Sequence, residues 1–399
     1  MLSQLTPLLG IIFIFVLSAF LSSERKRINW ILVCWGIGLQ FSFAILILKT
    51  YPEVFFEKAR SIFEGITFYA SQGSRFLFGS LVDQKDFTIL SMGSVIIFVS
   101  AMMGVLNYIK ILPMITVFMA RIMKKAMKTS GAETLAASMS IFMGIEAISG
   151  LKNYIGRMTH SELFSVMTCF MATIAGSVMA VYVGVFGANP GYILAASFMN
   201  APAALVLSKI LIPETDIPET SGSVKLKDIS SQDHGLIEAL SNSALDGMKL
   251  TLSVGAMLLA FVAVIHLSNS ALGLLGTSFD HIGSLAFAPV AFLIGIPWND
   301  CMVAGKLIAI KTVFNEWIAY SQMKELVASG QLQSRSTMIL TFALCSFANF
   351  GSLGILIGGI SSLAPERRSE VASLGMKSIL AGLLSSLLTA CVAGLIMTS

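Results

Sequence analysis

Long apolar runs recur along the whole chain and alternate with short polar segments. A helix of about 20 apolar residues is long enough to cross the ~30 Å hydrocarbon core of a bilayer. The pattern therefore predicts an all-α polytopic membrane protein with about eight transmembrane helices. These helices are expected at residues 7–22, 29–49, 88–112, 163–187, 190–212, 247–268, 338–361 and 372–397.

Two further apolar segments, 131–158 and 297–326, are interrupted near their middles by polar residues. Glu146 interrupts the first segment, and Asn315 with Glu316 interrupts the second. Counting either segment as a full span would break the order of inner and outer loops. Each is therefore expected to be a re-entrant helical hairpin, which enters and leaves the membrane on the same side.

A broken span follows each hairpin. Polar, glycine-containing patches at 173–177 and 349–352 interrupt the spans 163–187 and 338–361. A unit of hairpin, broken helix and unbroken helix thus occurs twice, and the two hairpins enter from opposite sides. Inverted repeats with discontinuous helices are typical of secondary transporters, which bind their substrate near the membrane midplane.

Composition and charge set the orientation. Hydrophobic residues make up 55% of the chain and charged residues 12%, with a mean hydropathy of +0.83, whereas ordinary soluble domains carry about 25% charged residues. Basic residues gather at 25–27, 121–128 and 367–368. The positive-inside rule places these clusters in the cytoplasm, so both termini are expected outside. Since basic residues follow the first run and none precedes it, that run is expected to be a retained span.

Glu146 and Glu316 are the first candidate binding residues. A carboxylate at membrane depth costs about 2.5 kcal/mol or more unless it is paired, protonated or facing a water-filled cavity. Each could simply cap a hairpin helix, but their matching places in the two repeats favour ligand binding. Helix breaks also free main-chain carbonyls, which together with the Thr173 hydroxyl would suit a hard monovalent cation.

The chemistry of the second hairpin and second break indicates a hydroxylated substrate. Carboxylate and amide groups such as those of Glu316, Asn315 and Asn349 suit the vicinal hydroxyls of a sugar, because each hydroxyl both donates and accepts hydrogen bonds. Nearby aromatic rings could cover the face of a flat substrate; these are Phe347, Phe350 and Trp317.

Other functional classes receive less support. No HExxH, GxSxG or Walker pattern occurs, and the four histidines are scattered. We therefore expect no enzyme, no organic cofactor and no nucleic-acid partner. Two alternatives stay open from the residues alone: a membrane-embedded enzyme acting on a lipid-linked sugar or nucleotide, and a passive channel.

Five segments resemble the concentrative nucleoside transporter family, in the same order along the chain. The string GKLIAIKTVFNEWIAY at 305–320 resembles the family signature G-x-K-x-x-x-N-E-F-x-A-Y, with Ala309 in place of its Gly and Trp317 in place of its Phe. The other matching strings are GSRFLFGSLV at 73–82, ATIAGSV at 172–178, NAPAALVLSKILIPET at 200–215 and CSFANFGSLGI at 345–355. The resemblance covers nearly the whole chain.

The resemblance implies cation-coupled import of a nucleoside, or of another ribosyl compound, across a bacterial cytoplasmic membrane. It also implies a homotrimer embedded in lipid, in which a scaffold holds a transport domain that moves like an elevator. The implied ribose-binding residues are Glu316, Asn349 and Ser352 with Phe347 beside them, the implied nucleobase contact is Val178, and the implied cation ligands are Thr173 with main-chain oxygens of Met139, Phe142 and Ile174.

The expected division of the chain follows from the repeats and this resemblance. The interfacial helix is expected within 51–86, where aromatic and charged residues alternate at helical spacing. The parts are N-terminal scaffold helices at 1–128, a first transport repeat at 129–214, a cytoplasmic loop at 215–246, a scaffold helix at 247–270 and a second transport repeat at 271–399.

The first hairpin tip departs from the family pattern. Gly144, Ile145 and Ile148 stand where family members commonly carry a Gln, a Thr and a Pro, so that only Glu146 keeps a polar side chain. The Gln and Thr would face the nucleobase, and losing one such contact changes affinity by ~1 to 3 kcal/mol. Met139 also lacks the polar side chain often found at its position. The base preference and the choice between sodium and proton therefore stay open.

Overall fold

A computed structural model describes residues 2–50, 52–83, 88–219 and 233–397, and it contains no strand within these ranges. Six helices among the described residues are long and apolar enough to cross a membrane: Trp30–Thr50, Ile89–Tyr108, His160–Gly184, Pro190–Leu211, Leu236–Gly273 and Pro365–Ile396. They coincide with six of the predicted spans. The other two predicted spans correspond to the shorter apolar helix Leu5–Phe20 and to a broken helix. The prediction of an all-α membrane protein is confirmed.

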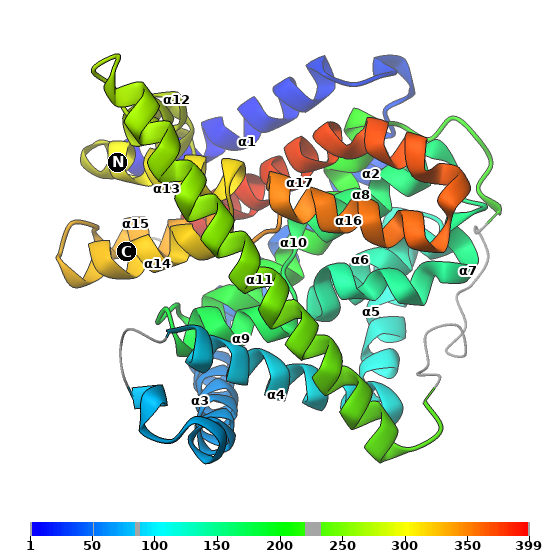
Figure 1. Ribbon diagram of the computed structural model, residues 1–399. Coiled ribbons are helices and arrows are strands. Elements are labelled where there is room, and N and C mark those ends of the chain that lie inside the picture. Colours follow the sequence, from blue (N-terminus) through cyan, green and yellow to red (C-terminus); the bar gives the residue numbers. More distant parts are fainter. Residues whose placement is uncertain (1, 51, 84–87, 220–232, 398–399) are drawn as a thin grey trace.

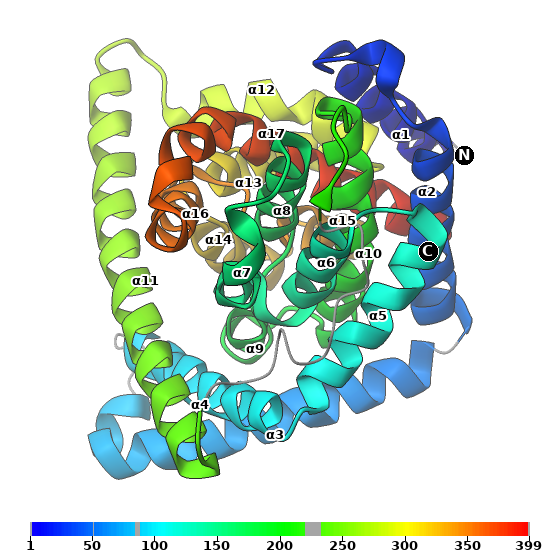
Figure 2. The same ribbon diagram turned by 90° about the vertical axis from the view of Figure 1, so that its right-hand side faces the viewer.

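The helices form an inner group and an outer frame (Figures 1 and 2). The outer helices are α1 (Leu2–Phe20), α2 (Trp30–Ala44), α3 (Pro52–Phe78), α4 (Thr88–Tyr108), α5 (Ile111–Met127), α11 (Leu236–Gly273) and α12 (Phe279–Leu293). The inner helices are α6 (Gly131–Met143), α7 (Lys152–Ile155), α8 (His160–Ala172), α9 (Gly176–Gly184), α10 (Pro190–Leu211), α13 (Cys301–Val313), α14 (Glu316–Ala328), α15 (Ser334–Leu344), α16 (Phe350–Leu363) and α17 (Arg368–Ile396).

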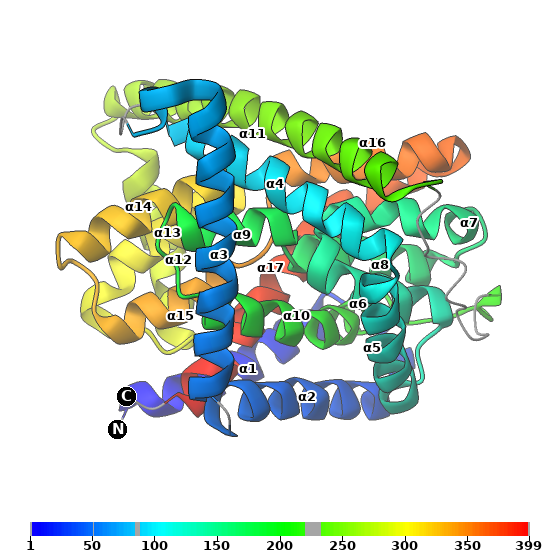
Figure 3. The ribbon, with the colours of Figure 1, turned by 90° about the horizontal axis from the view of Figure 1, so that it is seen from below.

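Burial distinguishes the two groups. In the apolar stretches of α10 and of the α8 and α9 pair, 89% of residues are buried inside the protein, compared with 11% in α11. Most side chains in the apolar stretch of α11 are therefore not covered by the described part of the chain. Helix α4 packs along α11, and α1 begins on the same side of the molecule as α17 ends (Figures 1 and 3).

Short helices lie where the sequence predicts re-entrant hairpins. Helices α6, α13 and α14 each have 13 residues, which gives a length of about 20 Å at ~1.5 Å per residue. None of the three is long enough to cross a ~30 Å hydrocarbon core. Breaks follow at 173–175, between α8 and α9, and at 345–349, between α15 and α16.

Three segments differ from the sequence expectation. Helix α11 begins at Leu236 and not near 247, because the strongly helix-forming residues of LIEAL extend it into the segment expected to be a loop. Helices α5 and α12 were not expected as separate elements. Lys110 ends the preceding helix in a left-handed conformation, with φ of 65°, and this backbone turn carries no signal in a hydropathy pattern.

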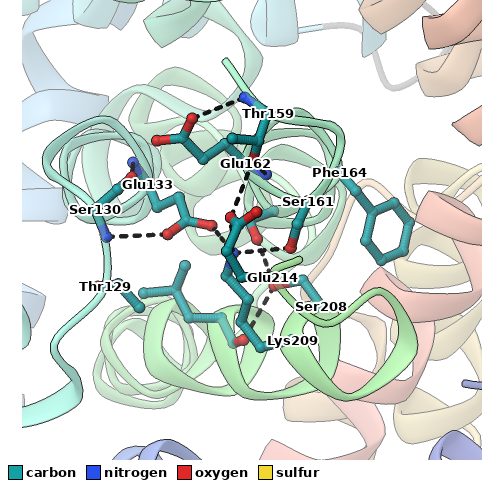
Figure 4. Close-up of polar contacts among 12 residues, drawn as sticks. Thr129, Ser130, Glu133, Thr159, Ser161, Glu162, Phe164, Ser208, Lys209 and Glu214 are labelled. Atoms are coloured by element: carbon teal, nitrogen blue, oxygen red, sulfur yellow. Dashed lines mark hydrogen bonds and ion pairs between the residues drawn. The ribbon is translucent and has the colours of Figure 1, made fainter. Parts of the chain in front are cut away.

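A buried ionic cluster joins three of the inner helices (Figure 4). Lys209 of α10 forms ion pairs with Glu133 of α6 and with Glu214, whose Oε2 lies 3.1 Å from the Lys209 Nζ. The same ammonium donates a hydrogen bond to the Ser161 Oγ of α8 at 2.8 Å. Glu214 in turn accepts a hydrogen bond at 3.0 Å from Thr159, the N-cap of α8. The cluster thus connects the first residues of α6 and α8 to the end of α10.

Candidate functional site

Two asparagines start the helices that border the second hairpin tip and the second break. The Asn315 Oδ1 accepts a hydrogen bond from the Ile318 amide at 3.0 Å and caps α14. The Asn349 Oδ1 accepts one from the Ser352 amide at 2.8 Å and caps α16. Asparagine is a preferred N-cap because its side-chain oxygen satisfies an otherwise unpaired amide. Each asparagine therefore fixes where its helix begins: α14 at Glu316 and α16 at Phe350.

Glu316 is the first residue of α14, and its carboxylate is held by two neighbours. Its Oε1 accepts a hydrogen bond from the Tyr182 hydroxyl at 2.9 Å, and its Oε2 accepts one from the Asn349 Nδ2 at 2.7 Å. Tyr182 comes from α9, and its ring stacks on Tyr320 with centroids 4.4 Å apart. The carboxylate is thus oriented by one group from the first repeat and one from the second break.

A cavity of about 240 Å³ opens beside this carboxylate. Its size is slightly below the ~300 Å³ at which typical ligand sites begin, which suits a small solute. The polar residues of its lining are Asn315, Glu316 and Ser352. Apolar side chains line the rest: Ala175, Val178, Leu250, Val254, Met257, Trp317, Phe347 and Ile355. A small molecule that carries both hydroxyl groups and an apolar part would match this mixed lining.

The ends of α6 and α8 meet next to the first break. Thr173 is fully buried, and its Oγ1 donates a hydrogen bond to the Cys169 carbonyl at 3.0 Å, which leaves the lone pairs of the hydroxyl available. The Phe142 carbonyl oxygen would lie 3.0 Å from a Cβ built on Gly176. Carbonyl groups at a helix C-terminus lack intrahelical partners and carry the negative end of the dipole. Two such ends favour a cation here.

Three family models match consecutive parts of the chain. The model described as "Na+ dependent nucleoside transporter N-terminus" matches residues 9–81, "Nucleoside recognition" matches 89–189, and "Na+ dependent nucleoside transporter C-terminus" matches 192–394. The chain belongs to the family of sodium-dependent nucleoside transporters. Because the members of this family are transporters, the chain is a transporter rather than an enzyme, and the hypothesis of a lipid-linked sugar enzyme is set aside.

Relatives in this transporter family align over nearly the whole chain. The protein named "Uncharacterized transporter YutK" of Bacillus subtilis is 38% identical over 97% of this chain and 98% of its own length. Solute carrier family 28 member 3 of Eptatretus stoutii is 35% identical over 99% of this chain, and Sodium/nucleoside cotransporter 1 of Rattus norvegicus is 36% identical over 98%. The chain spans 61% and 64% of the length of the latter two proteins.

Solved structures of the same transporter family share the fold. CNTnw in an inward-facing substrate-bound state has a TM-score of 0.92 and 36% sequence identity, with 99% of this chain and 98% of that chain covered. A double variant of CNTnw in an outward-facing state also has a TM-score of 0.92 at 36% identity, with 99% and 97% covered.

The structure brings most of the predicted substrate residues together. Val178, Asn315, Glu316, Phe347 and Ser352 line the cavity, and Asn349 lies directly behind Glu316. The side chains of Ile145 and Glu146 lie outside the described part of the chain, so their roles stay predictions. Phe350 is 46% exposed and is not among the residues that line the cavity, whereas Phe347 and Trp317 are; whether these rings cover a substrate stays a prediction.

Three features of the site were not predicted. Tyr182 lies four residues after Val178 and therefore on the same face of the helix. Its hydroxyl could have been predicted from the sequence as a further polar group of the site. Leu250, Val254 and Met257 form one apolar stripe of α11 along the cavity, but a lipid-facing stripe has the same spacing. Lys311 is fully buried, and its Nζ has no hydrogen-bond partner among the described residues; it occupies the Lys position of the family signature.

Gly144 at the first hairpin tip is required by backbone geometry, and we expect Gly144→Ala to lower nucleoside uptake several-fold. Its φ is +54°, and a Cβ there would lie 2.7 Å from the Ala175 amide nitrogen. Forcing a side chain into this conformation costs about 1 to 3 kcal/mol, and the clash displaces the first break as well. Gly187→Ala is the matched control, because Gly187 has φ of +75° but no neighbour within 4 Å. Equal uptake and equal Tm for the two variants would contradict this explanation.

Proposed function

We propose that this transporter imports nucleosides by symport with a monovalent cation. The observation that carries the proposal is the Glu316 carboxylate, which Tyr182 and Asn349 hold at the wall of a cavity sized for a small solute. A buried carboxylate with lone pairs left over is a strong acceptor for two neighbouring sugar hydroxyls. The names of the matching family and of Sodium/nucleoside cotransporter 1 support nucleosides as the substrate class.

In this proposal one end of the nucleoside contacts the polar residues of the cavity and the other end contacts apolar ones. The ribose hydroxyls bind Glu316 and Asn349, with Asn315 and Ser352 beside them. The nucleobase lies against Val178 and Phe347. Gly144 and Ile145 provide no polar side chain towards the base, so we propose that base selectivity is weaker than in members with Gln and Thr at these positions, and that Glu146 supplies the only polar side chain of that tip.

The coupling cation would bind where α6 and α8 end. Its ligands would be the Thr173 hydroxyl and the main-chain oxygens of Met139, Phe142 and Ile174. Oxygen atoms suit a hard cation such as sodium, but the buried Met139 thioether is a soft ligand and adds nothing for it. We propose sodium as the first candidate, because the names of the matching family and of Sodium/nucleoside cotransporter 1 support it. Proton coupling is the second candidate, because Met139 supplies no polar side chain for sodium.

The proposed movement is that of an elevator in a homotrimer. Residues 129–214 and 274–399 would form the moving transport domain, while residues 1–128 and helix α11 would form the scaffold in the cytoplasmic membrane, with both termini outside. The cavity supports this division, since its walls come from α11 on one side and from the inner helices on the other. CNTnw has been solved in inward-facing, outward-facing and intermediate states, which supports a moving domain in this fold.

The experiment that tests the proposal is uptake of labelled uridine and adenosine by cells that lack their own nucleoside transporters. We expect accumulation above the outside concentration, which a passive channel cannot produce. Proteoliposomes with either a sodium gradient or a pH gradient then identify the coupling ion, because only the coupled gradient drives accumulation. Absence of uptake for every nucleoside, in protein that is shown to reach the membrane, would refute the proposal.

A further inference from the structure

Asn200, in the middle of α10, lies between the two helix breaks. Its side chain is fully buried. Its Nδ2 donates one hydrogen bond to the Ala172 carbonyl at 2.8 Å and a second to the Cys345 carbonyl at 2.9 Å. Ala172 is the last residue of α8, and Cys345 directly follows the last residue of α15. One side-chain amide thus connects the first break to the second.

The bonding capacity of the amide explains why an asparagine fits this place. The end of each helix leaves carbonyl groups unpaired, and in a dry interior such groups need a donor. An amide nitrogen has two N–H groups, so it can serve two carbonyls at once. Because carbonyls only accept hydrogen bonds, the nitrogen must face them and the amide cannot be flipped. The Asn200 Oδ1 has no hydrogen-bond partner among the described residues.

A hydrogen bond between main-chain groups also joins the same two breaks. The Phe347 amide donates a hydrogen bond to the Thr173 carbonyl at 3.3 Å. Thr173 belongs to the proposed cation site and Phe347 to the proposed substrate site. The two sites are therefore adjacent through the main chain, and Asn200 holds the two chain segments in register immediately beside that bond.

We propose that Asn200 is a positioning residue that couples cation binding to substrate binding. A cation that draws the carbonyls of the first break towards itself changes the position of Ala172, and through the Asn200 amide it changes the position of Cys345. Cys345 lies two residues before Phe347 and four before Asn349, so the second break takes up its substrate-binding geometry together with the first. This inference rests on the proposed function, because it assumes that both sites are occupied as assigned there.

The coupling is measurable as the ratio of two dissociation constants for the nucleoside: the Kd without the coupling cation divided by the Kd with it. Two ligands that share a coupled site change each other's equilibrium affinity by the same factor, which is typically about 5 to 150. Labelled uridine and adenosine are bound to purified protein with sodium or with choline, and at pH 5.5 or 7.5. In the wild type we expect at least a fivefold tighter binding in the presence of the coupling cation. In Asn200→Ala we expect this factor to fall below about two.

The ratio separates coupling from a purely structural role. A residue that only stabilises the fold would lower protein abundance, or weaken binding equally with and without the cation, and the ratio would stay at the wild-type value. Asn200→Ser is the milder second variant, since one hydroxyl can donate to only one of the two carbonyls, and its ratio is also expected to fall. Ser208→Ala is the matched control: Ser208 is fully buried on the same helix, but its Oγ bonds the Ser165 Oγ at 2.9 Å and the Leu205 carbonyl at 3.0 Å, and neither partner belongs to a helix break.

The outcomes distinguish the two proposals. A wild-type protein that binds neither nucleoside under any condition refutes the proposed function itself. A wild type that shows coupled binding, together with an unchanged ratio in Asn200→Ala or Asn200→Ser, overturns the inference about Asn200 and leaves the proposed function intact. A lowered ratio in both variants and an unchanged ratio in Ser208→Ala supports it.

Discussion

Replacing Glu316 by Gln is expected to lower nucleoside uptake at subsaturating concentrations by roughly 10- to 100-fold, while the protein still inserts into the membrane. Glutamine keeps the shape of the side chain, and its amide can still serve both neighbours, with the oxygen accepting from Asn349 and the nitrogen donating to Tyr182. It loses the negative charge, and a hydrogen bond to a charged group contributes about 1.5 to 3 kcal/mol. That loss corresponds to the expected fold-change in rate.

The measurement is initial-rate uptake of labelled uridine and adenosine, normalised to the amount of transporter in the membrane. Glu325→Gln is the matched control, because Glu325 lies on the same helix but is exposed, and its uptake should equal that of the wild type. Tyr182→Phe removes one donor to the carboxylate and keeps the ring, so its uptake should fall less than that of the Gln variant. Wild-type uptake by Glu316→Gln would reject the assignment of the substrate site.

Much of the fold was predictable because it depends on patterns that hydropathy records. The spans, the polar interruptions at Glu146 and Glu316 and the helix breaks after them are all visible as departures from apolar runs. Helix ends within polar or mixed segments were not predictable in this way. The start of α11 at Leu236 and the end of α4 before Lys110 depend on local backbone conformation, and neither changes the mean hydropathy of its surroundings.

From the sequence, the candidate site could be predicted only for residues that are unusual in an apolar segment because of their own chemistry. Glu316, Asn349 and Thr173 stand out because polar groups at membrane depth need partners. Tyr182 and Asn200 are equally polar, but Glu316, which Tyr182 serves, and Cys345, one of the two partners of Asn200, each lie more than a hundred positions away along the chain. Only the packing of the two repeats against each other reveals that Tyr182 serves Glu316, and that Asn200 serves two main-chain carbonyls at once.

The ionic cluster around Lys209 carries the largest expected effect on stability. Lys209→Met leaves Glu133, whose side chain is 2% exposed, without its ion-pair partner, and it also removes the partner of Glu214. Breaking one side of a buried ion pair typically destabilises a protein by about 3 to 5 kcal/mol, because an uncompensated charge is left in the interior. We expect the free energy of unfolding to fall by that amount and the apparent Tm in detergent to fall by several degrees.

Two further variants show whether the charge is the cause. In Lys209→Met combined with Glu133→Gln the buried charge is removed as well, and we expect part of the lost stability to return, since replacing a whole buried pair is far less costly than breaking it. Lys249→Met is the exposed control: its ion pair with Asp246 has side chains 75% and 71% exposed, and such a surface pair contributes less than about 1 kcal/mol. If the Lys209 and Lys249 variants unfolded at the same temperature, the cluster would not hold the first residues of α6 and α8 to the end of α10, and another contact would have to fix the first repeat.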